Sequence, residues 1–249
     1  MVGRVEIRYG ALRTDYMNQL SEPIMATTPV EHTGDRVLHN YFRSSSAYRV
    51  RIALNLKSLP YEYVAVHLTR NGGEQFAPAF KSLNPHALVP VLSENGLDIS
   101  QSMAILEYLE EAYPAPPLLP SALGDRAYVR QLAFAVACEI HPINNLRVLK
   151  YLTGPLALGE EAKMAWIHHW LRVGLDGLEA ELARSSKRGR FCFGVTPTLA
   201  DCCLVPQIFN AKRFNADLSA YPTIMEIFEA CEALPAFQQA RPGVQPDAE

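Results

Sequence analysis

The segment Tyr113–Ser121 limits the possible folds more than any other feature, because four prolines fall within the run YPAPPLLPS. Proline fixes φ and lacks an amide hydrogen, so this run cannot form the interior of a helix or a strand. Strand-like patterns occur only before it, and only helical patterns follow it. We therefore predict an α/β domain over residues 36–113, a proline-rich linker over 114–121 and an all-α domain over 122–249, preceded by a flexible extension over 1–35.

Residues 36–113 alternate between strand-like and helix-like patterns, in the order βαβ and then αββα. The predicted elements are the strand VLHNYF, the helix AYRVRIALNLKS, the strand LPYEYVAVHL, the short helix GEQFAPAFKSLN, the hairpin LVPVLSENGLDIS and the helix SQSMAILEYLEEAY. Pro90 stands inside LVPVL, where a central strand would exclude it, so it marks a bend, an edge or a cis bond. This order is the thioredoxin-like arrangement, in which such a proline is typically cis and presents neighbouring backbone to a peptide-like ligand.

Charge and cysteine usage narrow the class of protein. The formal net charge of −3 argues against nucleic acid or an anionic membrane as the main partner. No apolar run approaches the roughly 20 residues that span a bilayer. An odd number of cysteines without a CxxC pair disfavours a disulfide framework or a metal site and favours a reducing, cytoplasmic location. These cysteines are Cys138, Cys192, Cys202, Cys203 and Cys231.

One helix start in the predicted all-α domain is well specified. Thr198 precedes Asp201 by three residues in GVTPTLADCCLVPQ, which matches an N-capping box. In such a box each side chain satisfies a backbone amide of the other residue. We interpret the pair as a folding element, and the adjacent Cys202 and Cys203 as small apolar residues of a buried helix.

Five stretches of the chain carry a family pattern: SSSAYRVRIALNLKSLPYE, LNPHALVPVL, ISQSMAILEYLEE, IHPINNLRVLKYL and TLADCCLVPQIFNAKRF. Together, in this order over about Leu38–Pro242, they resemble the zeta class of glutathione transferases. The family motif is usually Ser-Ser-Cys-x-Trp-Arg-Val-Arg-Ile-Ala, so Ser46 stands here in place of the cysteine and Tyr48 in place of the tryptophan. The resemblance implies the glutathione transferase fold, glutathione as the cofactor and a homodimer.

The serines Ser44, Ser45 and Ser46 precede an arginine-bearing helix. A free thiol has a pKa near 8.5 and is mostly protonated at neutral pH. The amides and dipole of a helix N-terminus, together with a hydroxyl donor, favour the thiolate, and Arg49 nearby can raise the positive potential. The resemblance implies that Ser44 stabilises the glutathione thiolate and that Ser45 shares the catalytic site. The structural alternative is a serine-rich N-cap.

The resemblance also implies binding roles along the chain. The backbone of Val89 would pair with the cysteinyl backbone of glutathione, and Gln75 would lie near the glycine end. Gln101 and Ser102 would hold the γ-glutamyl carboxylate at a helix start. His141 stands where the family often has glutamine, and it can carry charge near pH 6.5. The full set implied for glutathione is Ser44, Ser45, Ser46, Ala47, Tyr48, Arg49, Gln75, Val89, Gln101, Ser102, His141, Asn145, Leu146 and Arg147, and that for a dianionic substrate is Arg49, Arg147 and Arg213.

The activity implied by the resemblance is the glutathione-dependent cis–trans isomerisation of maleylacetoacetate to fumarylacetoacetate, a step of tyrosine and phenylalanine catabolism, with transferase activity on small α-haloacids beside it. Isomerisation of maleylpyruvate and general glutathione transfer are enzymatic alternatives. A non-catalytic interaction module of the same fold is a third, against which the intact serines, Val89-Pro90 and Gln101-Ser102 argue. A thioredoxin-type disulfide reductase is disfavoured, because the turn before the helix contains no cysteine.

Overall fold

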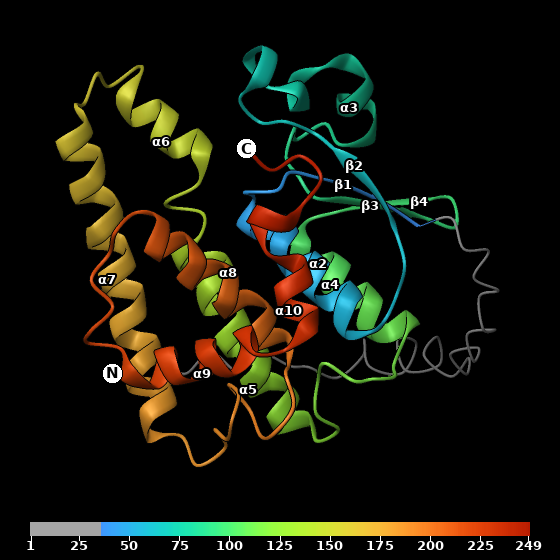
Figure 1. The fold of residues 1–249 in the computed structure, drawn as a ribbon, viewed down its shortest axis with the longest axis vertical. Coiled ribbons are helices and arrows are strands. Elements are labelled where there is room, and N and C mark those ends of the chain that lie inside the picture. The colour runs from blue at the N-terminus through green and yellow to red at the C-terminus, as the bar shows by residue number, and fades with distance from the viewer. Residues whose placement is uncertain (1–35) are drawn as a thin grey trace, which may run out of the picture. The chain divides into compact units, whose positions relative to one another are not determined.

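The computed structural model describes residues 36–249, so the predicted extension over 1–35 lies outside the described residues. The first half contains a four-stranded sheet in the order β2-β1-β3-β4. Strand β1 pairs in parallel with β2 and antiparallel with β3, and β3 and β4 form an antiparallel hairpin (Figure 1). The strands are β1 (Val37–Asn40), β2 (Glu62–Ala65), β3 (Val91–Glu94) and β4 (Leu97–Ser100). The predicted thioredoxin-like arrangement with a closing helix is thereby confirmed.

Three α-helices accompany this sheet: α2 (Ser45–Leu56), α3 (Pro78–Leu83) and α4 (Ser102–Ala112). Helices α2 and α4 pack against each other on one side of the sheet, and α3 lies on the other (Figure 1). Each strand is shorter than its sequence pattern, because the flanking residues turn away into loops. The 3-10 turns η1 (Arg70–Gly72) and η2 (Glu74–Phe76) precede α3, so that the region predicted as one short helix is irregular, as expected.

Two backbone features shape the loops beside the sheet. The Val89–Pro90 peptide bond is cis, which agrees with the prediction from Pro90, and strand β3 begins only after this proline. Gly73 has φ +113°, and a Cβ there would lie 2.7 Å from Nε2 of Gln75. Glycine at this position therefore satisfies the backbone conformation and leaves room for the buried Gln75 side chain.

The proline-rich segment contains neither helix nor strand, as predicted, and it is anchored to the first half by a buried ion pair. Lys57 Nζ donates to Glu110 Oε2 at 2.9 Å and to the carbonyls of Tyr113 at 2.6 Å and Pro116 at 2.9 Å. The Glu110 carboxylate also accepts the amides of Leu118 and Leu119. Because these bonds fix the segment locally, it is an ordered connection. The division of the chain into domains at this segment stays a prediction.

In the residues described, the second half contains helices joined by loops and has no strand. Its elements are α5 (Leu123–Phe134), the π-helical segment η3 (Ala135–Ile140), α6 (Leu146–Thr153), α7 (Glu160–Arg184), α8 (Leu199–Arg213), α9 (Pro222–Glu232), α10 (Pro235–Ala240) and the 3-10 turn η4 (Pro242–Val244). Helix α8 lies at the centre of this half, and it packs against α2, α5 and α9. Cys202 and Cys203 are fully buried in it, which confirms their interpretation as small core residues.

The two halves share one hydrophobic core, which includes residues of α2 and α4 as well as α5, α7, α8 and α9. Helix α10 then returns to the first half and packs against α2 (Figure 1). Asn55 Nδ2 donates to the carbonyl of Ala236 at 2.9 Å, and Arg51 Nε to that of Ala240 at 3.0 Å. The end of the chain, which the sequence pattern assigned to the helical half, is therefore attached to the sheet-bearing half.

Candidate functional site

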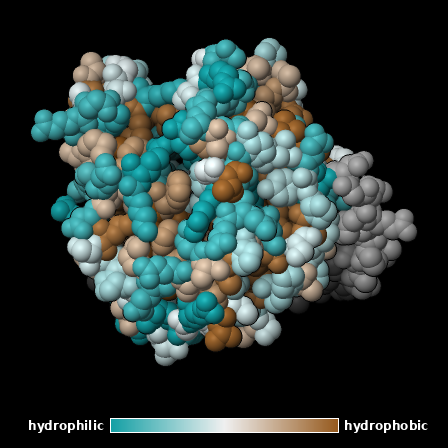
Figure 2. All heavy atoms as spheres, viewed as in Figure 1, coloured by the Kyte–Doolittle hydropathy of each residue, from teal (hydrophilic) through white to brown (hydrophobic). Residues whose placement is uncertain are grey.

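A cavity of about 340 Å³ lies between the start of α2 and the helices α6 and α8. The molecular surface dips between the parts that carry α3 and α6, and hydrophilic residues predominate on the face in view (Figure 2). The predicted site residues on the cavity wall are Ser44, Ser45, Ser46, Gln75, Val89, His141, Asn145, Leu146, Arg147 and Arg213. The fold thus brings residues from both halves of the chain to one hollow.

The serines form a chain of hydrogen bonds at the N-terminus of α2. Ser44 is the N-cap residue, and its Oγ accepts the Ala47 amide at 3.2 Å. Ser46 Oγ donates to the carbonyl of Val89 at 3.1 Å and lies 3.0 Å from Ser44 Oγ. Since a hydroxyl has one proton and Ser46 uses it on Val89, the proton between the two serines belongs to Ser44. Ser44 is therefore a cap and also a donor that points to its neighbour at the cavity wall.

Gln75 and Val89 lie on the same wall as the serines. Val89 precedes the cis proline and is tied to α2 through Ser46. Gln75 is buried, and its Nε2 reaches only the Leu68 carbonyl at 3.5 Å, while its Oε1 has no hydrogen-bond partner among residues 36–249. A buried polar atom without a partner is costly, so an amide carbonyl aimed at a cavity is suited to bind a donor on a ligand.

The helical half supplies the opposite wall from the start of α6. Asn145 caps this helix by accepting the Arg147 amide at 3.2 Å, and its Nδ2 lies 3.5 Å from His141 Nε2. Burial, and secondarily the charge of Arg49, lowers the pKa of His141 to about 3. The imidazole is consequently neutral at physiological pH, which corrects the expectation that it can be charged near pH 6.5.

Cationic side chains surround the cavity. They are Arg43, Arg147, Lys150 and Arg213. Burial, followed by the neighbouring charge of Arg43, lowers the pKa of Arg213, and both residues line the cavity. Arg43 and Lys150 were not predicted from the sequence. Arg43 directly precedes the serines, and that adjacency is the signal by which it could have been found.

Two buried amides also line the cavity and were not predicted. Gln207 is 1% exposed, and neither atom of its side-chain amide has a partner in the described part of the chain. Asn144 donates weakly to the Ile167 carbonyl at 3.5 Å, and its Oδ1 has no partner there either. Nothing in the sequence distinguishes Gln207 from an ordinary residue of a buried helix. Both amides can offer neutral hydrogen-bonding groups to a bound molecule.

Several predicted site residues lie elsewhere. Ala47 is fully buried, and Tyr48 packs edge-on against Phe209 with ring centroids 6.0 Å apart. Arg49 is 2% exposed and donates from Nη1 to Ser102 Oγ at 3.2 Å, so it lies in the interior and does not line the cavity. The physical reason is the packing of α2 against α4, α8 and α10, which removes the side chains on its packed faces from the cavity.

The position of Arg49 corrects the expectation of a direct substrate contact. Its Nε and Nη2 have no partner within residues 36–249, and burial lowers its pKa. Ser102, bonded to it, is also buried, whereas the neighbouring Gln101 is exposed with φ +72°. Neither Gln101 nor Ser102 lines the cavity formed by this chain.

Within residues 36–249 no helix is both long and apolar enough to cross a membrane. The same region contains no group of three His, Cys, Asp or Glu side chains arranged to hold a metal ion.

Known proteins resemble this chain over most of its length. Residues 38–117 match the family described as glutathione S-transferase, N-terminal domain. A probable maleylacetoacetate isomerase of Vibrio cholerae is 52% identical over 212 residues, which cover 85% of this chain and 98% of the relative. The holo structure of a maleylpyruvate isomerase, described as a bacterial zeta-class glutathione S-transferase, has a TM-score of 0.83 and 51% identity, and covers 86% of this chain and 100% of its own. A maleylacetoacetate isomerase structure from Methylobacterium extorquens AM1, with bound malonate and glutathione, has a TM-score of 0.82 and 39% identity, and covers 86% and 99%.

Proposed function

Since the chain belongs to the zeta class of glutathione transferases, we propose that it catalyses the glutathione-dependent cis–trans isomerisation of maleylacetoacetate to fumarylacetoacetate. One observation carries this proposal. A serine-capped helix N-terminus and a group of guanidinium side chains face each other across a single cavity. The first is suited to a thiolate, and the second to the two carboxylates of a maleyl-type diketo acid.

The residues present fit glutathione. The tripeptide needs a partner for its cysteinyl backbone, donors near its sulfur and hydrogen-bonding groups along its length. Val89 offers backbone beside a cis proline, Ser44 offers a hydroxyl, and Gln75 offers a buried amide oxygen without a partner among the described residues. Gln101 and Ser102, which the resemblance assigns to the γ-glutamyl carboxylate, remain part of the proposal as residues at the start of α4.

Bound glutathione would supply a thiolate for reversible addition to the activated double bond, and it would be regenerated when the bond to sulfur breaks after rotation. The Ser44 hydroxyl directs its proton at Ser46 Oγ, so it can turn this proton toward a sulfur without breaking the bond from Ser46 to Val89. The dipole of α2 raises the potential around this hydroxyl, and the charge of the buried Arg49 acts on His141, which lines the same cavity. We assign thiolate stabilisation to Ser44, with Ser45 beside it in the same first turn.

Arg43, Arg147 and Arg213 bind the carboxylates of the substrate in this proposal. Arginine holds carboxylates through paired N–H donors, and the influence of Arg43 on the pKa of Arg213 supports a shared anion-binding space. Arg49 is not included, because its side chain is buried and bonded to Ser102. His141 contributes a neutral imidazole to the same wall.

Isomerisation of maleylpyruvate is the second candidate. The similarity to a maleylpyruvate isomerase structure, at 51% identity and a TM-score of 0.83, favours it specifically. Both substrates carry the same maleyl group, and the cationic wall suits either. Comparing turnover of maleylacetoacetate, maleylpyruvate and a small α-haloacid, each with and without glutathione, decides among the enzymatic candidates. Absence of turnover with all three, together with no retention on immobilised glutathione, would leave the non-catalytic module.

Arg213→Met tests the anion-binding role. We expect KM for the maleyl substrate to rise about tenfold while KM for glutathione stays unchanged, because a charge-assisted bond to one carboxylate is lost. Arg188→Met is the matched control, since Arg188 pairs with Glu226 at 3.2 Å outside the cavity. If both substitutions raised KM for the maleyl substrate equally, Arg213 would act only through the overall charge of the protein and not by binding a carboxylate.

The remaining parts of the proposal concern organisation. We propose that residues 36–113 bind glutathione, that 122–249 bind the second substrate, that two copies form a homodimer and that the protein works in the cytoplasm. Free cysteines at each of the five positions support a reducing compartment. Sedimentation analysis tests the dimer, and fractionation of the source cells tests the location.

A further inference from the structure

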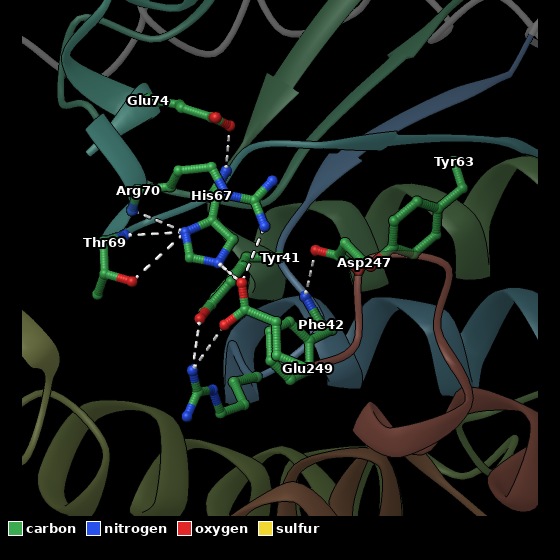
Figure 3. Close-up of polar contacts among 10 residues, drawn as sticks. Tyr41, Phe42, Tyr63, His67, Thr69, Arg70, Glu74, Asp247 and Glu249 are labelled. Carbon is green, nitrogen blue, oxygen red and sulfur yellow. Dashed lines mark hydrogen bonds and ion pairs between the residues drawn. The ribbon is translucent and has the colours of Figure 1, made fainter. Parts of the chain in front are cut away.

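The carboxylates near the end of the chain contact the turn that leads to the serines (Figure 3). Asp247 Oδ2 accepts the backbone amide of Phe42 at 3.1 Å, and Asp247 Oδ1 accepts the hydroxyl of Tyr63. Phe42 lies in the turn Tyr41–Arg43, between β1 and α2. Asp247 therefore links the end of the chain to two elements of the sheet-bearing half. We refer to residues 245–249 as the acidic strap.

Glu249 makes a second attachment beside the first (Figure 3). Its Oε1 accepts Arg70 Nη2 at 2.9 Å and lies 3.1 Å from His67 Nε2. His67 Nδ1 accepts the Arg70 amide at 2.8 Å, so the ring proton resides on Nε2 and is donated to Glu249. Glu249 Oε2 also lies 3.8 Å from the guanidinium of the cavity-lining Arg43.

The turn Tyr41–Arg43 is held from its other side by a buried arginine. Arg51 Nη2 donates to the Phe42 carbonyl at 2.9 Å, and Arg51 Nη1 donates to Asn40 Oδ1 at 3.0 Å. Asp247 and Arg51 thus bind the amide and the carbonyl of the same residue. Because Asp247 provides the side-chain acceptor for the Phe42 amide, removing it frees one side of this arrangement.

The turn connects directly to the groups that the proposed function needs. The Ser44 amide donates to the Tyr41 carbonyl at 3.0 Å, so the position of Ser44 depends on the turn. Arg43 Nη2 donates to the Tyr41 hydroxyl at 3.1 Å, and its guanidinium lies 4.8 Å from the centre of the Phe42 ring. A shift of the turn therefore moves a thiolate donor and an anion-binding cation together.

We propose that Asp247 and Glu249 are positioning residues, which hold the turn Tyr41–Arg43 so that Ser44 and Arg43 face the cavity. That these two carboxylates hold the turn is a statement about structure alone, whereas their effect on catalysis rests on the proposed function. Asp247 acts through the Phe42 amide, and Glu249 through the guanidinium of Arg43. The strap thereby connects the last residues of the chain to the start of α2.

Asp247→Ala and Asp247→Asn, made in the full chain, test the role of Asp247. For Asp247→Ala we expect hydrogen exchange of the Phe42 amide in the ligand-free protein to accelerate about tenfold or more. The pKa of the glutathione thiol bound to the protein, followed by thiolate absorbance, should rise, and kcat/KM should fall about tenfold. Asp247→Asn should restore most of each property, because its amide oxygen can still accept the Phe42 amide.

The matched control is Asp176→Ala, which removes another carboxylate that accepts a tyrosine hydroxyl, from Tyr221 at 2.9 Å. It should leave exchange at Phe42 and the pKa of the bound thiol unchanged. Glu249→Gln tests the second attachment without touching the Phe42 amide. We expect it to raise KM for the maleyl substrate severalfold at unchanged kcat, because Arg43 loses an orienting charge.

The outcomes separate this inference from the proposed function. Unchanged exchange at Phe42 and an unchanged thiol pKa in Asp247→Ala would overturn the positioning role, whatever the isomerase activity. If the parent protein turns over no maleyl acid, the proposed function fails, while exchange and glutathione affinity still decide whether the strap holds the turn. If Asp247→Ala does not fold, Glu249→Gln decides, and an unchanged KM for the maleyl substrate overturns the proposal.

Discussion

Two helices of this protein, α8 and α2, have an N-cap residue with a hydroxyl group, but the two hydroxyls serve different purposes. Helix α8 begins at Thr198, whose amide and hydroxyl both bond to Asp201 Oδ2, at 2.7 and 2.8 Å. Asp201 Oδ1 in turn accepts the amide of Cys192 at 2.9 Å, and the whole group is buried. Helix α2 begins at Ser44, whose cap bond is longer, at 3.2 Å, and whose hydroxyl faces a cavity.

The charges behind these two starts are opposite. Asp201 is a fully buried carboxylate, and burial raises its pKa although its hydrogen bonds oppose the change. Arg49, in the second turn of α2, is a buried guanidinium with two nitrogens that lack partners in the region described. The Asp201 carboxylate has hydrogen-bond partners inside the protein. The Arg49 guanidinium, in contrast, contributes a positive charge that helps to lower the pKa of His141. This difference separates a helix start that stabilises the fold from one that can bind an anion.

Asp201→Ala tests the buried N-terminus of α8. We expect this substitution to have the largest effect, and the effect is on stability. Removing the acceptor leaves the amides of Thr198 and Cys192 buried without partners, so we expect a loss of about 3 kcal/mol in the free energy of unfolding. The kcat of the folded fraction should stay within about twofold of the parent, because Asp201 does not line the cavity. Urea unfolding and a parallel activity measurement check both expectations.

Asp217→Ala is the control for that experiment, since Asp217 accepts the Ser219 amide at 2.9 Å on the surface. A far smaller loss of stability is expected there. If Asp201→Ala lowers kcat strongly without lowering stability, the two helix starts do not differ in the way described.

Ser44→Ala tests the N-terminus of α2, which faces the cavity. We expect kcat/KM to fall about 100-fold, because a directed donor to the thiolate is lost. The free energy of unfolding should fall by only about 1 kcal/mol, the usual worth of a serine N-cap. The pKa of the bound thiol, measured by thiolate absorbance, should rise at the same time. Activity that survives unchanged would remove Ser44 from its assigned role.

Local patterns in the sequence predicted the parts of the fold that depend on neighbouring residues. Pro90 predicted an interruption of the strand, because proline is excluded from the interior of a central strand. The peptide bond before it is cis. The spacing of Thr198 and Asp201 specified a capping box, which the structure contains. In both cases the physical cause lies within a few residues, so one sequence was enough.

The site could be predicted only in part, because its walls meet through tertiary packing. Arg43, Lys150 and Gln207 reach the cavity only when α6 and α8 face the start of α2. The bond between Phe42 and Asp247 joins residues 205 positions apart, and no local pattern indicates it. A family motif likewise does not tell which of its residues point inward.

The pH dependence of stability tests the environment of His141, in which burial and, to a smaller degree, the charge of Arg49 lower the pKa. The pKa of His141 is about 3 in the folded protein, compared with 6.5 for a free histidine, so between these values the unfolded chain binds more protons. The stability contributed by the neutral ring is therefore complete above pH 6.5 and is lost as the pH falls toward 3. One such group gives a slope of at most about 1.4 kcal/mol per pH unit.

His141→Gln should remove this part of the pH dependence, and unfolding by urea at pH 7 and at pH 5 measures it. The same two unfolding curves for the parent protein give the reference. Identical pH dependence in both proteins would mean that the folded protein does not lower the pKa of His141 through burial and the charge of Arg49.

Ser46 is expected to have the smallest effect, although the family resemblance led us to expect a cysteine at this position. Its hydroxyl donates to Val89 and accepts from Ser44, so it joins the start of α2 to the loop before the cis proline. Ser46→Ala removes both bonds, which frees the Ser44 proton for a sulfur while loosening Val89. Because these consequences oppose each other, we expect kcat/KM to change by no more than about threefold. Ser46→Cys keeps a weak donor to Val89 and should lie between the parent and Ser46→Ala. If Ser46→Ala lowered kcat/KM as much as Ser44→Ala, the essential hydroxyl would be that of Ser46. The N-terminus of α2 would then act through the second residue of the helix.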